Sequence, residues 1–220
     1  MAAAAINITT PESAQTDRKK ESLNRDQMVQ VSRRLDWRFL LPDPTLSQVV
    51  YIGPENDDLL KSLDHFSEYL SVLSHGELKI YREGNGRHFD LLIARSPSID
   101  ELNKGISLLE SGAYIYWEIQ RPNAIKSIKK GNIRLKHAGK NIAFLEKMGF
   151  TDIEMHWHRP NFWACREIIP LDGSRALDNA FRKGHSNLKG QLKETAGKTL
   201  KASGLLPYYV NCFSLVGKKR

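Results

Sequence analysis

Cysteines and long apolar stretches are scarce in this sequence. Its 220 residues include two cysteines, Cys165 and Cys212, which lie too far apart to form a recognised motif. The pair is typical of free thiols in a reducing compartment, so no disulfide framework is expected. No run approaches the roughly 18 apolar residues of a membrane span, and the alanine-rich start, Met1 to Ile6, is too short for a secretory signal. We therefore expect a cytoplasmic protein without a membrane span.

Acidic residues are scarce in the second half of the chain. Residues 1–120 carry 13 Lys and Arg against 18 Asp and Glu, a balance of −5, whereas residues 121–220 carry 20 against 7, a balance of +13. A basic half of this kind attracts a small anionic molecule or an acidic protein partner. The lysine-rich amphipathic stretch 182–201 leaves contact with a membrane surface open. A solvated lysine-rich helical face is the alternative explanation.

Strand and helix signals alternate after the first 26 residues, which have few large apolar side chains and are expected to form a flexible tail. Strand signals lie at 48–52, 69–73, 77–81, 89–94, 113–119, 151–157 and 208–216, and helix signals at 57–69, 98–112, 141–148 and 188–202. Ser98 and Glu101 form a capping box, and Gly112 is expected to close that helix. The alternation predicts a single domain at 27–220, an α/β fold with a Rossmann-like, doubly wound, mostly parallel sheet and helices on both faces.

A turn with one glycine lies where an α/β nucleotide-binding fold cradles its ligand. Residues 49–52 form an apolar strand signal, and Gly53 and Pro54 turn the chain toward the next helix. The later glycines of a G-x-G-x-x-G fingerprint let ligand and helix approach the backbone, but Glu55 and Asp57 follow here. The sequence indicates a ligand-binding scaffold with an altered loop.

Two further landmarks give residues 45–217 a resemblance to class I S-adenosylmethionine-dependent methyltransferases. Residues 108–115 match the family's "leucine-leucine, one or two residues, glycine-rich turn, strand" before the fifth strand. Residues 144–150 match "leucine, two residues, glycine-phenylalanine" before the sixth. The resemblance implies a Rossmann-like fold and S-adenosylmethionine as cofactor, with the following residues in contact with it: Gly53, Pro54, Glu55, Ser74 and Arg95.

The chain departs from the family's pattern at the cofactor. The family carries an acid two positions before its first glycine, and Tyr51 stands there. The second and third glycines of the family's loop fall on Glu55 and Asp57. The acid that ends the family's second strand and binds the ribose is replaced by the pair Leu73 and Ser74.

Polar side chains follow several expected strands, at the edge where ligands bind in open α/β sheets. Arg95, Arg121 and Arg159 could form a clamp for phosphate or carboxylate, or each could pair with a nearby acid such as Glu118 or Glu167.

The histidines His156 and His158 point to the same side of one expected strand. They lack a suitably spaced third ligand, so no metal site is expected. His158, assisted by Glu118, is the candidate general base for methyl transfer to a hydroxyl, and a histidine packed for structural reasons is the alternative.

The segment 158–170 mixes aromatic, charged and proline residues and is expected to form a substrate-facing lid. Its candidate substrate contacts, together with those named at the strand ends, are Arg121, His156, Arg159, Asn161, Trp163 and Arg166.

Three functions remain open. The first is methyl transfer from S-adenosylmethionine to a small anionic metabolite or biosynthetic intermediate. The second is a catalytically silent methyltransferase-like domain that acts as a scaffold or binding partner in a biosynthetic assembly. Nucleic-acid binding is third, because the chain has no recognised nucleic-acid motif.

Overall fold

The computed structural model describes residues 23–74, 77–82, 88–120, 138–182 and 210–220, with residues 195, 197–200, 202, 203 and 206. The chain divides into two compact units, Met1–Glu110 and Ser111–Arg220. Elements of the first unit are α1 (Arg25–Arg33), η1 (Asp36–Leu40), β1 (Gln48–Ile52), α2 (Asp58–Phe66), β2 (Tyr69–Ser74), β3 (Glu77–Arg82), β4 (Phe89–Arg95) and α3 (Ile99–Ser107). Those that follow are β5 (Leu109–Gln120), α5 (Ala138–Lys147), β6 (Phe150–Arg159), β7 (Glu167–Pro170), α6 (Ser174–Arg182) and β8 (Cys212–Lys219).

The strands of the first unit follow the order β3-β2-β1-β4. Strand β1 pairs in parallel with both β2 and β4, as the βαβ pattern of the sequence predicts. The expectation that β3 also adds in parallel is wrong, because β3 pairs antiparallel with β2. Two residues separate Ser74 from Glu77, and a parallel connection needs a crossover of about a dozen residues.

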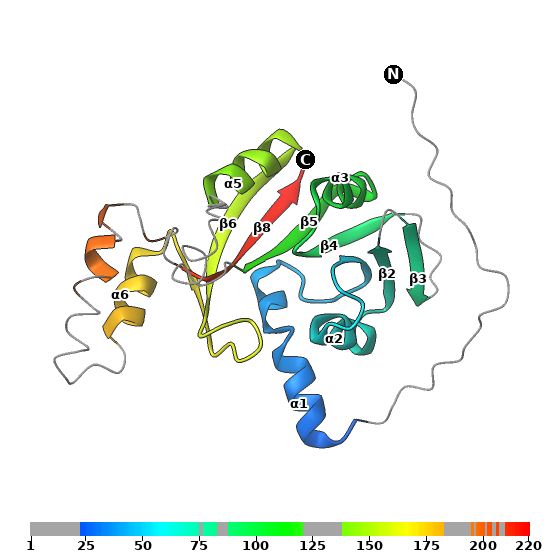
Figure 1. Ribbon diagram of the computed structural model, residues 1–220, viewed down its shortest axis with the longest axis horizontal. Coiled ribbons are helices and arrows are strands. Elements are labelled where there is room, and N and C mark those ends of the chain that lie inside the picture. The colour runs from blue at the N-terminus through cyan, green and yellow to red at the C-terminus, as the bar shows by residue number, and fades with distance from the viewer. Residues whose placement is uncertain are drawn as a thin grey trace, which may run out of the picture. The chain divides into compact units, whose positions relative to one another are not determined.

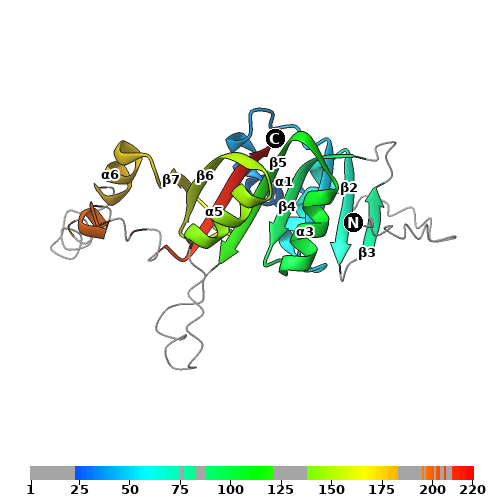
Figure 2. The same ribbon diagram turned by 90° about the horizontal axis from the view of Figure 1, so that it is seen from above.

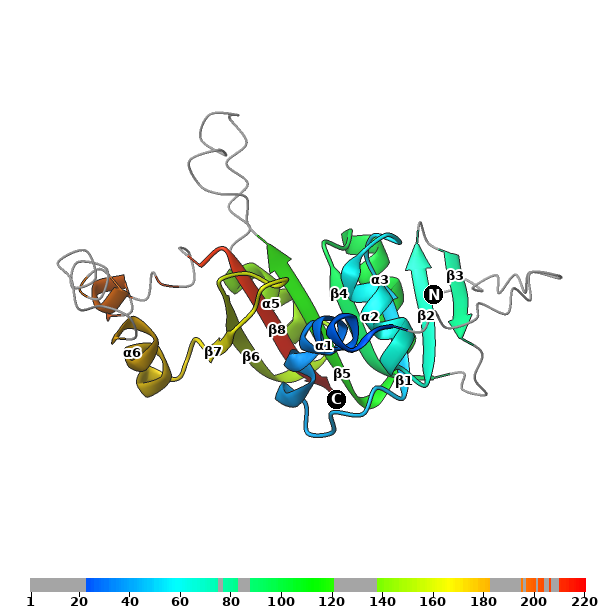
Figure 3. The same ribbon diagram turned by 90° about the horizontal axis from the view of Figure 1, so that it is seen from below.

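Helices cover both faces of the first unit's strands. Helix α3 lies on one face, where Gly105 packs against Ile52 and Leu92. Helices α1 and α2 lie side by side on the opposite face (Figures 1 and 3). Right-handed crossovers leave β1 and β4 toward opposite faces, which explains this placement. The α/β, Rossmann-like fold class is confirmed.

The second unit contains the strands β5-β8-β6-β7 in that order, and its assigned pairs are antiparallel. Helix α5 packs along β6, as Figure 2 shows, and α6 packs beside β7. Parallel pairing, which the sequence predicts for most of the sheet, is therefore confined to β2, β1 and β4 among the assigned pairs.

Some helix ends in the structure differ from the predicted ones. Helix α3 begins with the predicted capping box of Ser98 and Glu101, but it ends at Ser107. Gly112 does not close it: this glycine lies within β5 and has a φ of +86°. Gly149, which was expected to end α5, does follow that helix with a φ of +88°.

The predicted lid at 158–170 is shorter than expected. His158 and Arg159 belong to β6, and residues 167–170 form β7, which pairs with β6. Only residues 160–166 connect the two strands. Residues 167–170 are therefore a strand paired with β6 and not part of a loop.

The expected tail and the basic amphipathic stretch fall largely outside the described residues. Of the tail, residues 23–26 are described, and α1 begins within it at Arg25, with Asn24 as its N-cap. Within the described residues, no helix combines the length and the hydropathy needed to cross a membrane.

The close packing of α3 generates a prediction at Gly105. A side-chain carbon there would lie 2.7 Å from Ile52 Cδ1, and Ile52 is 1% exposed. Gly105→Ala is expected to lower the free energy of unfolding by about 1 kcal/mol, because overpacking outweighs the gain in helix propensity. Gly139→Ala in α5 is the matched control. It meets no atom within 4 Å, and urea unfolding should show a gain of about 0.5 kcal/mol. Stabilisation by both substitutions would contradict the packing argument.

Candidate functional site

The first unit has a crevice position at the carboxyl ends of β1 and β4. Strand β1 has β2 on one side and β4 on the other, so the chain leaves these two strands in opposite directions. Ligands of open α/β sheets bind at such a switch point. The residues that meet there are the turn after β1, which starts at Gly53, and Arg95 at the end of β4.

A buried carboxylate occupies this position. Asp57 caps the start of α2, where its Oδ1 accepts a hydrogen bond from the Leu59 amide at 3.2 Å. Its Oδ2 accepts the Tyr51 hydroxyl proton at 2.8 Å, and the Arg95 guanidinium forms an ion pair with Oδ1. The Asp57 side chain is 3% exposed, and that of Arg95 is 15% exposed. We call Tyr51, Asp57 and Arg95 the Asp57 network.

The ring of Tyr51 lies across Gly53. A side-chain carbon on Gly53 would lie 2.3 Å from the Tyr51 hydroxyl oxygen, so this residue must be glycine to let the tyrosine reach Asp57. In the resemblance, Gly53 gives a cofactor access to the backbone. In this structure the side chain of Tyr51 occupies the space beside Gly53.

The other predicted cofactor residues surround this network. Glu55 is exposed and forms an ion pair with Lys79 on β3 at 2.8 Å. The carbonyl of Pro54 accepts the Asp57 amide at 3.3 Å, which closes the turn. Ser74 is half-buried at the end of β2 and lies opposite Glu77.

These residues do not fit S-adenosylmethionine. A helix N-terminus with an arginine beside it is a natural site for a ligand's anionic group, and here the Asp57 carboxylate already takes that place. The tyrosine ring fills the approach to Gly53. The crevice therefore contains an internal anion in the position that a bound carboxylate would need.

The candidate general base, His158, and the acid predicted to assist it, Glu118, both belong to the second unit and are buried there. His158 is 2% exposed, with Nε2 at 2.8 Å from Ser214 Oγ and Nδ1 at 3.6 Å from Cys165 Sγ. Glu118 is 1% exposed and accepts the Tyr116 hydroxyl proton at 3.2 Å. The rings of Tyr116 and His158 form an edge-to-face pair with 6.3 Å between their centroids, so Tyr116 contacts both predicted groups.

His156 occupies a different environment from His158. It is 4% exposed, and its Nε2 lies 3.4 Å from a carboxylate oxygen of Glu154. Its Nδ1 is buried and has no hydrogen-bond partner among the described residues. Burial lowers the pKa of His156, while Glu154 and Asp172 act in the opposite direction.

Two of the predicted substrate contacts at the end of β6 and on the connection to β7, Arg159 and Asn161, already have hydrogen-bond partners within the chain. Arg159 donates to the Ala180 carbonyl at 2.7 Å and lies 3.6 Å from Glu167, which is the pairing with an acid that the sequence left open. Asn161 accepts the Ala164 amide at 2.8 Å. Trp163 is 48% exposed and Arg166 is exposed. The remaining candidate, Arg121, lies outside the described residues, so the three-arginine clamp stays a prediction.

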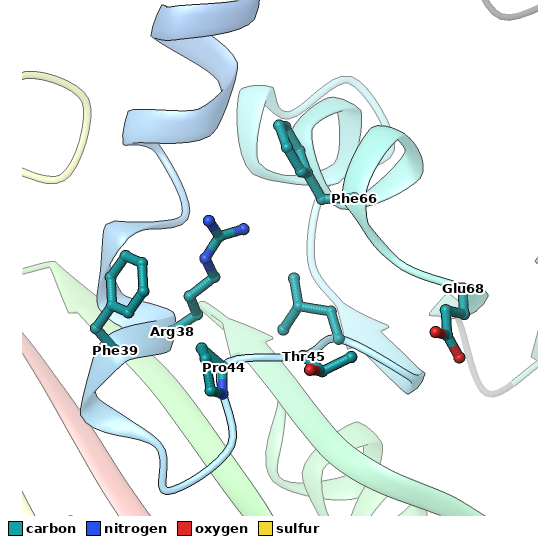
Figure 4. A pocket seen from close by; sticks show the side chains of 7 residues that line it. Arg38, Phe39, Pro44, Thr45, Phe66 and Glu68 are labelled. Carbon is teal, nitrogen blue, oxygen red and sulfur yellow. The ribbon is translucent and has the colours of Figure 1, made fainter.

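A cavity of about 300 Å³ lies at the opposite ends of the first unit's strands, before β1 and β2. It is lined by Arg38, Phe39, Pro44, Thr45, Leu46, Phe66 and Glu68. The Arg38 guanidinium carbon lies 5.0 Å from the centroid of the Phe39 ring and 5.6 Å from that of Phe66, an arrangement that Figure 4 shows. Phe39 is 65% exposed. None of the sequence-based predictions includes this cavity.

The three groups that sequence reasoning missed as functional are Tyr51, Asp57 and Ser214. Asp57 carried a readable signal, because an aspartate before a helical pattern is a preferred N-cap. The Tyr51 contact carried none, because it depends on how the turn after β1 places Asp57, six residues later. The Ser214 contact carried none, because His158 lies 56 residues away in the chain. Among the described residues, no three His, Cys, Asp or Glu side chains gather into a metal site.

Solved structures of similar fold include enzymes named as methyltransferases. The phosphoethanolamine N-methyltransferase 2 of Haemonchus contortus is 16% identical, with a TM-score of 0.43 over 89% of this chain and 53% of that chain, so this chain spans about half of its length. A possible histamine N-methyltransferase of Thermotoga maritima is 10% identical, with a TM-score of 0.44 over 88% of this chain and 90% of that chain. The N-methyltransferase NodS of Bradyrhizobium japonicum is 12% identical, with a TM-score of 0.42 over 89% and 95%.

Neither a protein-family model nor a curated protein matches the sequence. The likeness to these solved structures concerns the fold. Identities and TM-scores of this size assign no activity to the chain.

The Asp57 network predicts a large asymmetry between two neighbouring aspartates. Asp57→Ala is expected to lower the free energy of unfolding by about 3 kcal/mol or more, since it removes a helix cap and leaves Arg95 without its buried carboxylate. Asp58→Ala, at the exposed next position, should change it by less than about 0.5 kcal/mol. Urea unfolding of the two variants measures the difference, and equal midpoints would contradict the network's role.

His156 predicts a loss of stability in mild acid. Its folded-state pKa lies below that of an unfolded histidine, about 6.5, so the unfolded state binds more protons as the pH falls. The stabilising effect is complete above that pH and is lost below it, at up to about 1.4 kcal/mol per pH unit. Urea unfolding measured between pH 7.5 and pH 5 should show a smaller decrease in the free energy of unfolding for His156→Gln than for the wild type. Equal slopes for His156→Gln and the wild type would contradict this role of His156.

Proposed function

We propose that this chain is a methyltransferase-like binding domain that does not use S-adenosylmethionine and acts by associating with an acidic partner. The observation that carries the proposal is the Asp57 network. It supplies, from within the chain, the anion and the ring that fill the switch-point crevice of the first unit. Methyl transfer requires that crevice for the cofactor.

Opening the Asp57 network to admit a ligand would cost a free energy comparable to that of ligand binding itself. The Asp57 side chain is 3% exposed and interacts with three donors on three elements. Separating a buried ion pair leaves an uncompensated charge, which costs about 3 to 5 kcal/mol. A ligand would have to supply this free energy before any net binding, and a millimolar Kd corresponds to only about 4 kcal/mol.

Two features support an acidic partner. Arg38 lines the cavity before β1 and makes no ion pair with a described carboxylate, while two aromatic rings stack on it. An arginine in this setting binds carboxylate or phosphate groups well, because its planar guanidinium offers paired donors. Residues 121–220 carry a balance of +13, which favours the same kind of partner.

Calorimetric titration with S-adenosylmethionine and S-adenosylhomocysteine tests the proposal. The wild type is expected to give no saturable heat at ligand concentrations that detect a Kd of about 1 mM. Tyr51→Phe retains the ring and removes one donor, so it should remain equally silent if the ring excludes the ligand. Saturable binding by the wild type that disappears in Gly53→Arg would overturn the proposal and restore methyl transfer.

A further inference from the structure

The second unit contains an imidazole that contacts a thiol through one ring nitrogen and a hydroxyl through the other. Cys165 Sγ lies 3.6 Å from His158 Nδ1, and His158 Nε2 lies 2.8 Å from Ser214 Oγ. The imidazole is 2% exposed and Ser214 is 0% exposed, whereas Cys165 is half-buried. Cys165 is therefore the most exposed residue of this group.

Strand pairing fixes this geometry. Strands β6 and β8 are antiparallel, with His156 opposite Ser214, and this register brings Ser214 to the side of β6 that carries His158. The connection from β6 to β7 returns toward the same place, because the Arg166 amide donates to the Arg159 carbonyl at 2.9 Å. Cys165, one residue earlier, therefore faces His158. Phe162 packs against the His158 ring, with 4.7 Å between centroids, and limits its rotation.

The arrangement assigns complementary roles to the two imidazole nitrogens. When Ser214 Oγ accepts the Nε2 proton, Nδ1 carries a lone pair that points toward the thiol. A thiol beside a base of this kind is the usual form of an activated cysteine nucleophile. The Glu167 carbonyl, 3.4 Å from the sulfur, holds the side chain in place.

The chain's second cysteine provides an internal contrast. Cys212 is 5% exposed, and burial raises the pKa of its thiol, as do the charges of Glu118 and Cys165. A buried thiol of this kind is inert. The two cysteines should therefore differ in reactivity within the same folded molecule.

We propose that Cys165 is a nucleophilic thiol, with His158 as its base, and that it forms a mixed disulfide with a small anionic disulfide. The thiol proton moves to His158 Nδ1 as the sulfur attacks one sulfur of the disulfide. The disulfide bond breaks, its electron pair stays on the leaving sulfur, and that thiolate takes the proton from His158. One disulfide is exchanged for another, so no further oxidant is needed.

The surroundings of Cys165 select the electrophile. Its neighbour Arg166 is exposed and positively charged, and Trp163 presents a ring that is 48% exposed. The half-buried sulfur admits a small molecule more readily than a folded protein. A low-molecular-weight disulfide that carries carboxylates fits these three properties.

Alkylation of the folded protein tests the thiol. The wild type is treated with iodoacetamide across pH 5 to 9, and the labelled peptides are quantified by mass spectrometry. Cys165 should be modified at least about tenfold faster than Cys212. His158→Asn should lower the Cys165 rate below pH 7 by about tenfold and move the pH profile toward that of a free thiol. Cys212→Ala is the matched control, and it should leave the Cys165 rate unchanged.

Two further variants separate the effects of the neighbouring residues from a loss of folding. Ser214→Ala keeps the histidine and should lower the rate by a smaller factor, while circular dichroism shows whether each variant is folded. Arg166→Ala should slow the reaction with iodoacetate and leave the reaction with iodoacetamide unchanged. Oxidised glutathione should label Cys165 in the wild type and not in Cys165→Ser.

Three results would overturn the inference. They are equal labelling of both cysteines, a Cys165 rate that folded His158→Asn leaves unchanged, and no mixed disulfide with oxidised glutathione. The thiol cluster belongs to the second unit and the Asp57 network to the first. Failure of this inference is therefore distinguishable from failure of the proposed function.

Discussion

The first unit depends on one buried carboxylate. Asp57 caps α2, receives the Tyr51 hydroxyl from β1 and pairs with Arg95 at the end of β4, so a single side chain connects a helix with two strands. Burial removes water as an alternative partner for all three groups, which makes each dependent on the others. Gly53 in the turn after β1 leaves the space that the Tyr51 side chain needs to reach this carboxylate.

This arrangement shows how a side chain of the protein itself occupies the switch point of a Rossmann-like sheet. A helix N-terminus at a switch point attracts an anion, and an empty position of this kind would leave amides and an arginine unsatisfied. An aspartate at the N-cap satisfies both from within the chain. The first unit keeps its parallel strands and crossover helices around this aspartate. The proposed interaction sites, the Arg38 cavity and the Cys165 cluster, are built from other residues.

Short-range sequence patterns predict most helices and strands of the fold. They do not predict the contacts between residues far apart in the chain. The Ser98 and Glu101 capping box and the end of α5 before Gly149 were read from neighbouring residues, and both are confirmed. The end of α3 was misplaced, because Gly112 adopts its left-handed backbone inside a strand and not after a helix. The direction of β3 was misread, since a pattern of apolar residues gives a strand's existence and not its pairing.

For the candidate site, the sequence determined which residue types stand at the strand ends and that the glycine loop is altered. It could not determine what replaces the missing contacts, because Asp57 and Arg95 are 38 positions apart in the chain and meet only when β1 and β4 pair. Likewise His158 was readable as a base, but its partners Cys165 and Ser214 were decided by the turn between β6 and β7 and by the register of β8. Residue identity and local spacing are properties of the sequence; the distance between side chains from separate strands is fixed only by tertiary packing.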